Sequence, residues 1–242
     1  MSWACVTVMP VYNEAECVES VCLDWIRQMA DAGGALLVVD DGSSDESPRI
    51  LDRLAANEPR LIVVHQINGG HGAAVLNGYR QALALEPDWV FQVDSDGEMP
   101  AGLFQAIWAR RFDAEFVLGR RTGRRAHLLR LSLSTAHRWL LGIVFRVSVR
   151  DPNIPFRLMK TARLRRLLEF VPPGVFAPNV FLSLLAAKAG VLADGPEVPV
   201  APRAGGSPSI RGWRTLRLGA RCAGELARFR MRGWLRFREV MP

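Results

Sequence analysis

The feature that most constrains the fold is a pattern that recurs four times before residue 110: an apolar segment, a polar turn and a stretch of helical character. The apolar segments lie at residues 4–9, 36–39, 61–65 and 89–93, and turn formers such as Pro10 and Asn13 follow the first. We expect helices at 44–57, capped by Ser44 or Asp45, and at 73–85. Continuous apolar strands that alternate with helices are typical of a parallel sheet covered on both faces.

Polar residues follow three of these strands, and two of the strand ends are acidic. Ligands of open parallel sheets bind beyond the carboxyl ends of the strands, so we expect one crevice to collect these residues. At the fourth end, Asp94, Asp96 and Glu98 are spaced two residues apart and would share a face if the chain stayed extended. Three converging carboxylates favour a divalent cation such as Mg²⁺ bound against a diphosphate. The alternative for this segment alone is a strand followed by an acidic turn.

Six short motifs occur along the chain, and together they span roughly residues 4–210. They are Met9-Pro-Val-Tyr-Asn-Glu14, Val38-Val-Asp-Asp-Gly-Ser43, Asn68-Gly-Gly-His-Gly-Ala73, Asp94-Ser-Asp96, Gly119-Arg-Arg121 and Asp151-Pro-Asn-Ile-Pro-Phe-Arg157. In kind and order they resemble the motifs of family-2 glycosyltransferases of the GT-A fold, and most closely those of dolichol-phosphate mannose synthase and related polyprenyl-phosphate sugar transferases. Each motif by itself is weak evidence for the family, whereas six motifs in the order found in the family are specific evidence.

The resemblance implies an α/β, Rossmann-like, mostly parallel sheet flanked by helices. It also implies an inverting glycosyltransferase, dependent on Mg²⁺ or Mn²⁺, that moves a sugar from a GDP- or UDP-linked donor to an acceptor, here expected to be a polyprenyl phosphate. The donor-binding residues that it implies come from the first, second and fourth motifs: Pro10, Tyr12, Glu14, Asp40, Asp41, Asp94, Ser95 and Asp96. In the acidic pair, the second residue usually reads the base. Asp94 and Asp96 match the metal-binding pair, and Glu98 would be a third ligand.

The later motifs imply an acceptor side. Asp151 matches an acid near the acceptor, where it would act as a base, organise the acceptor or cap a turn. Arg157 would neutralise an anionic acceptor, with Arg120 or Arg121 as further candidates. Arg120 and Arg203 would contact the donor diphosphate. For Arg121 we expect a surface ion pair. His71 stands where relatives often carry Lys, and a structural role is the simpler expectation for it.

The charge is distributed unevenly along the chain. Residues 1–100 contain 5 arginines and 16 acidic residues, whereas residues 101–242 contain 26 basic and 8 acidic residues. Such a split predicts an anionic partner for the second half. In a helical projection of the C-terminal region, Arg214, Arg217, Arg221, Arg228 and Arg232 fall within about 60°. Leu216, Ala220, Ala223, Ala227 and Trp234 cluster opposite them, with Leu226 at the edge of this group.

We therefore expect a catalytic domain at residues 1–210 and, at 211–242, basic amphipathic helices in contact with an anionic membrane surface. Gly219, Gly224 and Gly233 favour two short helices over a single one, and packing of the apolar face on the catalytic domain is the alternative. The sequence predicts no membrane-spanning segment and no signal peptide. Four cysteines without metal-ligand spacing suit a reducing cytosol. The expected location is the cytosolic membrane face, and a membrane-protein partner remains open.

Other classes fit less well. A nucleic-acid-binding role would suit the sequence pI of about 10.0, but the acidic first half opposes it, and no binding motif for DNA or RNA is present. A nucleotidyltransferase would need a glycine-rich basic loop after the first strand, where Pro10-Val-Tyr-Asn-Glu14 stands instead. A glycosyltransferase with a hydroxyl acceptor and a non-catalytic scaffold remain as alternatives.

Overall fold

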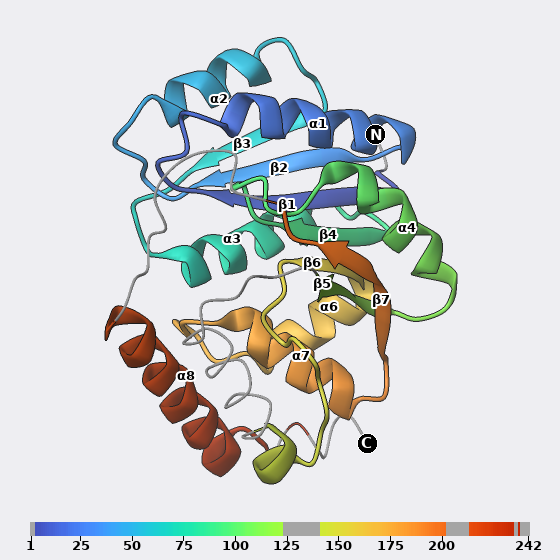
Figure 1. The fold of residues 1–242 in the computed structure, drawn as a ribbon, viewed down its shortest axis with the longest axis vertical. Helices are drawn as coiled ribbons and strands as arrows, with labels where there is room; N and C mark the ends of the chain where they lie inside the picture. The colour runs from blue at the N-terminus through green and yellow to red at the C-terminus, as the bar shows by residue number, and fades with distance from the viewer. Residues whose placement is uncertain (1–2, 123–140, 202–212, 235–236, 238–242) are drawn as a thin grey trace.

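The computed structural model describes residues 3–122, 141–201, 213–234 and 237. Seven strands form one sheet (Figure 1). They are β1 (Cys5–Val11), β2 (Ala35–Asp40), β3 (Leu61–His65), β4 (Trp89–Val93), β5 (Phe116–Thr122), β6 (Phe156–Lys160) and β7 (Leu192–Pro199). The helices are α1 (Val18–Asp31), α2 (Ser47–Ala55), α3 (His71–Ala84), α4 (Phe104–Trp108), α6 (Thr161–Leu168), α7 (Pro178–Lys188) and α8 (Trp213–Arg232). Three short helical segments join them: η1 (Ala101–Leu103), η2 (Ala109–Phe112) and η3 (Leu141–Phe145).

The strand order is β3-β2-β1-β4-β6-β5-β7. The four strands predicted from the apolar pattern pair in parallel, which confirms the expected α/β architecture. β6 runs antiparallel to both β4 and β5, so the sheet is mixed. This reversal brings the start of β6, and the loop before it, to the edge where β1, β2 and β4 end. The end of β5 reaches the same edge, because β5 is again parallel to β4.

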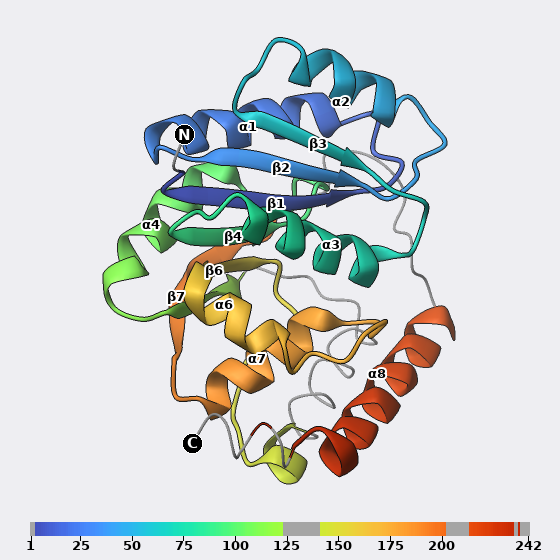
Figure 2. The same cartoon turned by 180° about the vertical axis from the view of Figure 1, so that it is seen from behind.

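Side chains that alternate along the strands build a core on each face of the sheet. On one face, Trp25 of α1 stacks on Phe91 of β4, and Phe104 and Phe156 complete the cluster. On the other face, α3 lies close to β1 because Gly78 has no side chain; a Cβ there would come within 2.3 Å of Val8 Cγ1. From behind, α3, α6 and α7 are seen on this second face (Figure 2).

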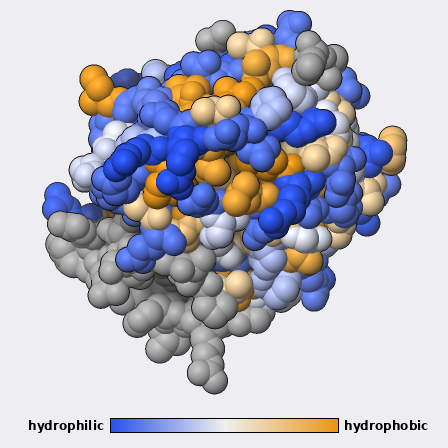
Figure 3. Space-filling view, turned by 90° about the horizontal axis from the view of Figure 1, so that it is seen from above, coloured by the Kyte–Doolittle hydropathy of each residue, from blue (hydrophilic) through white to orange (hydrophobic). Residues whose placement is uncertain are grey.

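The surface seen from above the sheet is mainly hydrophilic, with apolar side chains showing between the polar ones (Figure 3). This mixture is expected for amphipathic helices such as α1 and α2, whose apolar sides are buried against the sheet. Among the described residues, no helix combines the length and the apolar character needed to cross a membrane.

Helix α8 lies apart from the sheet, beside α7 (Figure 1). It is one continuous helix through Gly219 and Gly224, so the expected break at these glycines is wrong; the helix ends at Arg232, before Gly233. The predicted apolar face is also wrong in part. Ala220 and Ala227 are exposed, whereas Cys222 and Phe229 are buried. Leu226, predicted at the edge of the apolar face, is buried as well. The arginines at 217, 221, 228 and 232 are exposed, as the projection predicted.

Candidate functional site

A cavity of about 650 Å³ opens where the strands end. It is lined by Pro10, Val11, Tyr12 and Glu14 from the end of β1, by Asp41 after β2, and by the Asp94–Met99 turn after β4, except Gly97. The loop before β6 and Arg121 of β5 also line it. The crevice predicted from the strand ends is therefore present, and most of the candidate donor residues line it.

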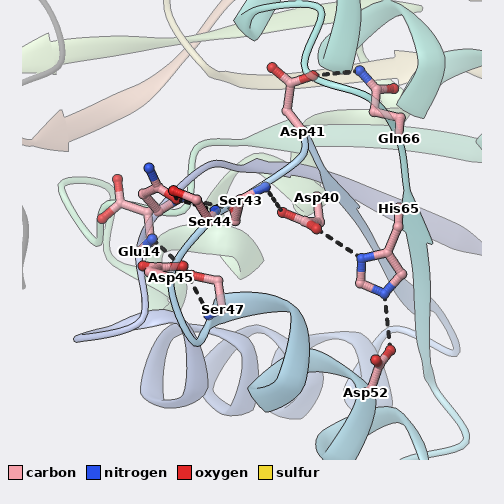
Figure 4. A network of polar contacts seen from close by, with 11 residues as sticks. Glu14, Asp40, Asp41, Ser43, Ser44, Asp45, Ser47, Asp52, His65 and Gln66 are labelled. Carbon is pink, nitrogen blue, oxygen red and sulfur yellow. Dashed lines mark hydrogen bonds and ion pairs between the residues drawn. The ribbon is translucent and has the colours of Figure 1, made fainter.

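Asp40, the last residue of β2, and Asp41, which follows it, point in different directions (Figure 4). Asp41 lines the cavity, and its carboxylate accepts hydrogen bonds from Gln66 Nε2 (2.7 Å) and from the backbone N–H groups of Gly69 and Gly70 (2.8 Å each). It thereby holds the glycine-rich loop that precedes α3. Gly70 has a φ of +85°, which suits a residue without a side chain.

Asp40 is outside the cavity lining, although it was a candidate donor residue. Its Oδ1 accepts the Ser43 N–H (3.0 Å), and its Oδ2 lies 2.8 Å from His65 Nδ1. The other ring nitrogen of His65 lies 3.0 Å from Asp52 Oδ1 on α2 (Figure 4). Hydrogen bonds to Asp40 and then to Asp52 raise the pKa of His65. The structure therefore places Asp40 as a brace between β2, β3 and α2.

The acidic segment after β4 leaves the extended conformation at once. Ser95 and Asp96 form a turn, Gly97 has a φ of +71°, and Asp96 Oδ1 accepts the Glu98 N–H over 3.0 Å. Because the chain turns, the spacing of two residues no longer puts the carboxylates on one face. In the described part of the chain, no three His, Cys, Asp or Glu side chains converge as metal ligands. Asp94, Asp96 and Glu98 nevertheless all line the cavity, so their role as ligands of a cation stays a prediction.

Asp94 is the more enclosed member of this pair. Its side chain is 29% exposed, Gln92 Nε2 donates to its Oδ1 (3.1 Å), and His71 Nε2 lies 3.8 Å from the same oxygen. Burial, opposed by His71, raises the pKa of Asp94, and the neighbouring Asp96 adds to this effect. Such a site disfavours an unaccompanied negative charge. Two neighbouring carboxylates that line one cavity fit Mg²⁺ or Mn²⁺, which need few protein ligands.

The cavity lining also includes the predicted Asp151 and Arg121, for which a surface ion pair was the favoured expectation. Asp151 Oδ2 lies 3.1 Å from Arg121 Nε, and both residues line the cavity. Arg121 is 18% exposed in its side chain, so it is not the surface residue that we expected. The alternation along β5 separates it from Arg120, which pairs with Glu197 outside the cavity lining. That alternation was the signal in the sequence that could have distinguished the two arginines.

Arg157 is fully buried and does not line the cavity. Its guanidinium donates to the backbone carbonyls of Pro152 (3.1 Å), Ile154 (2.6 Å) and Asn179 (3.0 Å). These bonds fix the loop that presents Asp151 and attach it to the first turn of α7. The structure therefore gives no support for contact between Arg157 and substrate, and indicates that it positions this loop. Burial is also the main cause that lowers the pKa of Arg157.

Arg203 and the domain boundary near residue 210 lie outside the described residues. Before Arg203, Ala201 donates its backbone N–H to the Glu98 carbonyl over 3.0 Å. The chain thus approaches the acidic turn just before the segment predicted to contact the diphosphate.

Apolar residues also line the cavity. They are Phe176 and Ala177, just before α7, Val180 in α7, and Leu218 and Cys222 of α8. Glu225 connects the two elements: its Oε2 accepts the Phe176 N–H (3.0 Å), and its Oε1 accepts from Arg221 Nε (2.9 Å). Helix α8 is thus part of the cavity wall. Packing of this helix on the catalytic domain was the alternative considered from the sequence, but its place in the cavity lining depends on tertiary structure and could not be predicted.

The mostly parallel sheet, with an acidic pair just after β4, agrees with the GT-A fold that the six motifs resemble. The family model described as glycosyl transferase family 2 matches residues 6–169. The chain belongs to this family.

Curated relatives match shorter stretches. The undecaprenyl-phosphate mannosyltransferase of Micrococcus luteus is 34% identical over 119 residues, which are 48% of this chain and 47% of that protein. The undecaprenyl-phosphate 4-deoxy-4-formamido-L-arabinose transferase of Proteus mirabilis is 30% identical over 118 residues, 47% of this chain and 35% of that protein. The chain therefore matches less than half the length of these relatives.

Among solved structures, glucosyl-3-phosphoglycerate synthase from Mycobacterium tuberculosis, in complex with Mn²⁺, UDP and phosphoglyceric acid, aligns with a TM-score of 0.66 at 20% identity. The alignment covers 94% of this chain and 78% of that one. At this identity the likeness shows the fold, and it confirms the GT-A assignment.

Proposed function

We propose that this protein transfers a sugar from a UDP- or GDP-linked donor to a polyprenyl phosphate, with inversion at the anomeric carbon. The observation that carries the proposal is the composition of one cavity. Asp94, Asp96, Asp151 and Arg121 all line it, together with apolar side chains from the start of α7 and from α8. In the reaction, an acceptor oxygen bonds to the anomeric carbon while the bond from that carbon to the diphosphate breaks, and the nucleoside diphosphate leaves.

The donor would occupy the side of the cavity formed by β1, β2 and β4. Tyr12, 45% exposed at the rim, would pack on the base or ribose, and Glu14 and Asp41 would accept hydrogen bonds from them. Pro10 and Ser95 complete this wall. Structures of glucosyl-3-phosphoglycerate synthase contain UDP-glucose and Mn²⁺, which supports a nucleotide-sugar donor here.

Asp94 and Asp96 are the residues that would hold the divalent cation. Bound there, the cation would neutralise charge on the leaving diphosphate. Arg203 and His71 are the further candidates for contact with the diphosphate. Because Asp40 and Arg120 lie outside the cavity lining, we assign them supporting roles in place of donor contact.

The acceptor would enter from the opposite side. A lipid phosphate is already anionic at neutral pH and needs positioning more than deprotonation, and Arg121 offers a guanidinium suited to phosphate oxygens. Phe176, Val180 and Leu218 would contact the first isoprene units. The relatives from Micrococcus luteus and Proteus mirabilis are named for transfer to undecaprenyl phosphate, which supports this acceptor class. A hydroxyl acceptor would instead require Asp151 to act as a general base.

The end of the molecule formed by η3 and α8, at the bottom of Figure 1, would contact an anionic membrane at the cytosolic face. Ile143 of η3 and Met231 of α8 are 73% and 70% exposed. Arg230 Nε donates to the Val144 carbonyl (3.3 Å), so these two segments are adjacent. Exposed arginines at 228, 230 and 232 surround them. Apolar side chains framed by arginines are typical of surfaces that bind anionic lipid.

A transfer assay tests the acceptor. Radiolabelled UDP- and GDP-hexoses are incubated with the protein, Mn²⁺ and detergent-dispersed undecaprenyl phosphate or undecaprenol, and the lipid phase is counted. The proposal predicts label in the lipid phase with the phosphate only. Label with undecaprenol, or transfer only to a soluble hydroxyl compound, would support the hydroxyl-acceptor alternative instead.

A further inference from the structure

Three buried polar side chains from three different elements form a line of hydrogen bonds that ends at Asp94. Tyr79 lies on α3, Asn179 in the first turn of α7 and Gln92 on β4, and they are 0%, 2% and 0% exposed. Tyr79 Oη donates to Asn179 Oδ1 (2.9 Å), Asn179 Nδ2 donates to Gln92 Oε1 (3.0 Å), and Gln92 Nε2 donates to Asp94 Oδ1 (3.1 Å).

The position of Gln92 in the sheet makes this line unusual. Its neighbours along β4, Phe91 and Val93, are apolar and fully buried, and Phe91 belongs to the aromatic cluster on the opposite face. An amide buried at such a position costs free energy unless each of its polar atoms finds a partner. Packing alone would be served better by an apolar side chain at residue 92. The hydrogen bond to Asp94 supplies the reason for an amide there.

The line also has a fixed direction. An ionised carboxylate only accepts hydrogen bonds, so Gln92 must turn its NH₂ group toward Asp94 and its carbonyl toward Asn179. Asn179 must in turn present its own NH₂ group to Gln92, and its carbonyl then accepts the hydroxyl proton of Tyr79. Each side chain therefore selects one orientation of the next. Arg157 fixes the backbone of Asn179 as well, through its carbonyl.

We propose that Tyr79, Asn179 and Gln92 are positioning residues that hold the Asp94 carboxylate in the orientation required to bind the divalent cation and the donor diphosphate. The inference rests on the proposed function. It adds that the geometry of the metal-binding acid is set from the core between α3, α7 and β4, and not by the surface turn that carries Asp96. Loss of a hydrogen-bond partner behind a metal ligand typically lowers metal affinity about 10- to 100-fold.

Binding of Mn²⁺ in the presence of UDP, followed by the decrease of the free Mn²⁺ signal in electron paramagnetic resonance, tests this inference without any turnover. Gln92→Met removes both amide bonds while keeping a similar volume, and we expect the Kd of Mn²⁺ to rise at least about tenfold. Tyr79→Phe removes only the first donor and leaves the ring in place. It should raise the Kd in the same direction by a smaller factor, because Asn179 and Gln92 can then adopt a second orientation.

The matched control is Thr7→Val, which also deletes a fully buried hydroxyl from the core. Thr7 Oγ1 donates to Met29 Sδ (3.0 Å) on the α1 face, away from Asp94, so Mn²⁺ affinity should not change. Circular dichroism without metal establishes that each variant is folded. If Gln92→Met does not fold, the Mn²⁺ affinity of Tyr79→Phe decides whether the inference holds.

Unchanged Mn²⁺ affinity in folded Gln92→Met and Tyr79→Phe would overturn the inference and leave the proposed function intact. Equal weakening by Thr7→Val would overturn it too, because any core lesion would then have the same effect. If the unaltered protein itself fails to bind Mn²⁺ with UDP or GDP, the proposed function fails first.

Discussion

At the scale of single residues, Asp96 offers the sharpest substitution in the site. Asp96→Asn keeps an oxygen that can accept the Glu98 N–H, so the turn should survive, but it removes the negative charge that a cation needs. We expect the Mn²⁺-dependent rise in melting temperature with UDP or GDP to disappear while the melting temperature of the free protein changes little. Asp113→Asn, which alters a surface ion pair with Arg110, is the control and should retain the rise. A normal rise in Asp96→Asn would exclude Asp96 as a metal ligand.

His65 provides a prediction about pH. Its two carboxylate partners raise its pKa in the folded protein above the usual value of about 6.5. The stabilisation is therefore complete below about pH 6.5 and is lost as the pH rises through the folded-state pKa. Urea unfolding should show that the protein loses more stability between pH 6 and pH 9 than His65→Gln does. The same pH dependence in both proteins would contradict a charged His65 between Asp40 and Asp52.

The acids at the strand ends could be predicted from the sequence, but their directions could not all be. Asp40 and Asp41 are adjacent, so alternation alone suggests that they diverge, yet His65 was needed to show where Asp40 goes. The extended model of Asp94–Glu98 failed because Gly97 permits a turn that no periodicity reveals. Gln92 was missed because it stands within an apolar strand and its partners come from α3 and α7.

At the scale of elements, the parallel strands could be predicted from their apolar segments, whereas the antiparallel strand β6 could not. Its sequence includes Arg157, and its direction depends on the loop that begins at Asp151. For α8, the projection grouped several alanines, but the aromatic side chains determined which side is buried. Phe229 packs against Phe181 of α7 with ring centroids 5.5 Å apart, and Trp234 packs against Phe145 at 4.8 Å.

The contact through Glu225 should couple α8 to the start of α7. Glu225→Ala removes the acceptor of the Phe176 N–H and the partner of Arg221, which we expect to cost about 1 kcal/mol of stability. Hydrogen exchange measured by mass spectrometry should then be faster in α8 and near Phe176 than in the central strands. Glu46→Ala, which removes an exposed ion pair with Arg49 on α2, is the control. Exchange that is faster throughout the protein, or that is not faster anywhere, would contradict a local contact between α8 and the start of α7.

At the scale of the whole molecule, the two ends have different tasks in this account. Residues at the ends of the strands line the cavity, whereas the end of the molecule formed by η3 and α8 would contact the membrane. Ile143→Asp should weaken sedimentation with vesicles that contain anionic phosphatidylglycerol, because it places a negative charge among the exposed arginines. Phe112→Asp changes a side chain that is 81% exposed on η2 and is the matched control. Equal binding by both variants would argue against this membrane-facing end.

The central claim is that the cavity binds a nucleoside diphosphate together with a divalent cation. The most direct test is isothermal titration calorimetry of the intact chain with UDP and with GDP, each with and without Mn²⁺. The account predicts saturable binding of at least one of these nucleotides that weakens strongly without Mn²⁺ and is lost in Asp96→Asn. Binding that ignores both the metal and this substitution, or no binding of either nucleotide, would contradict it.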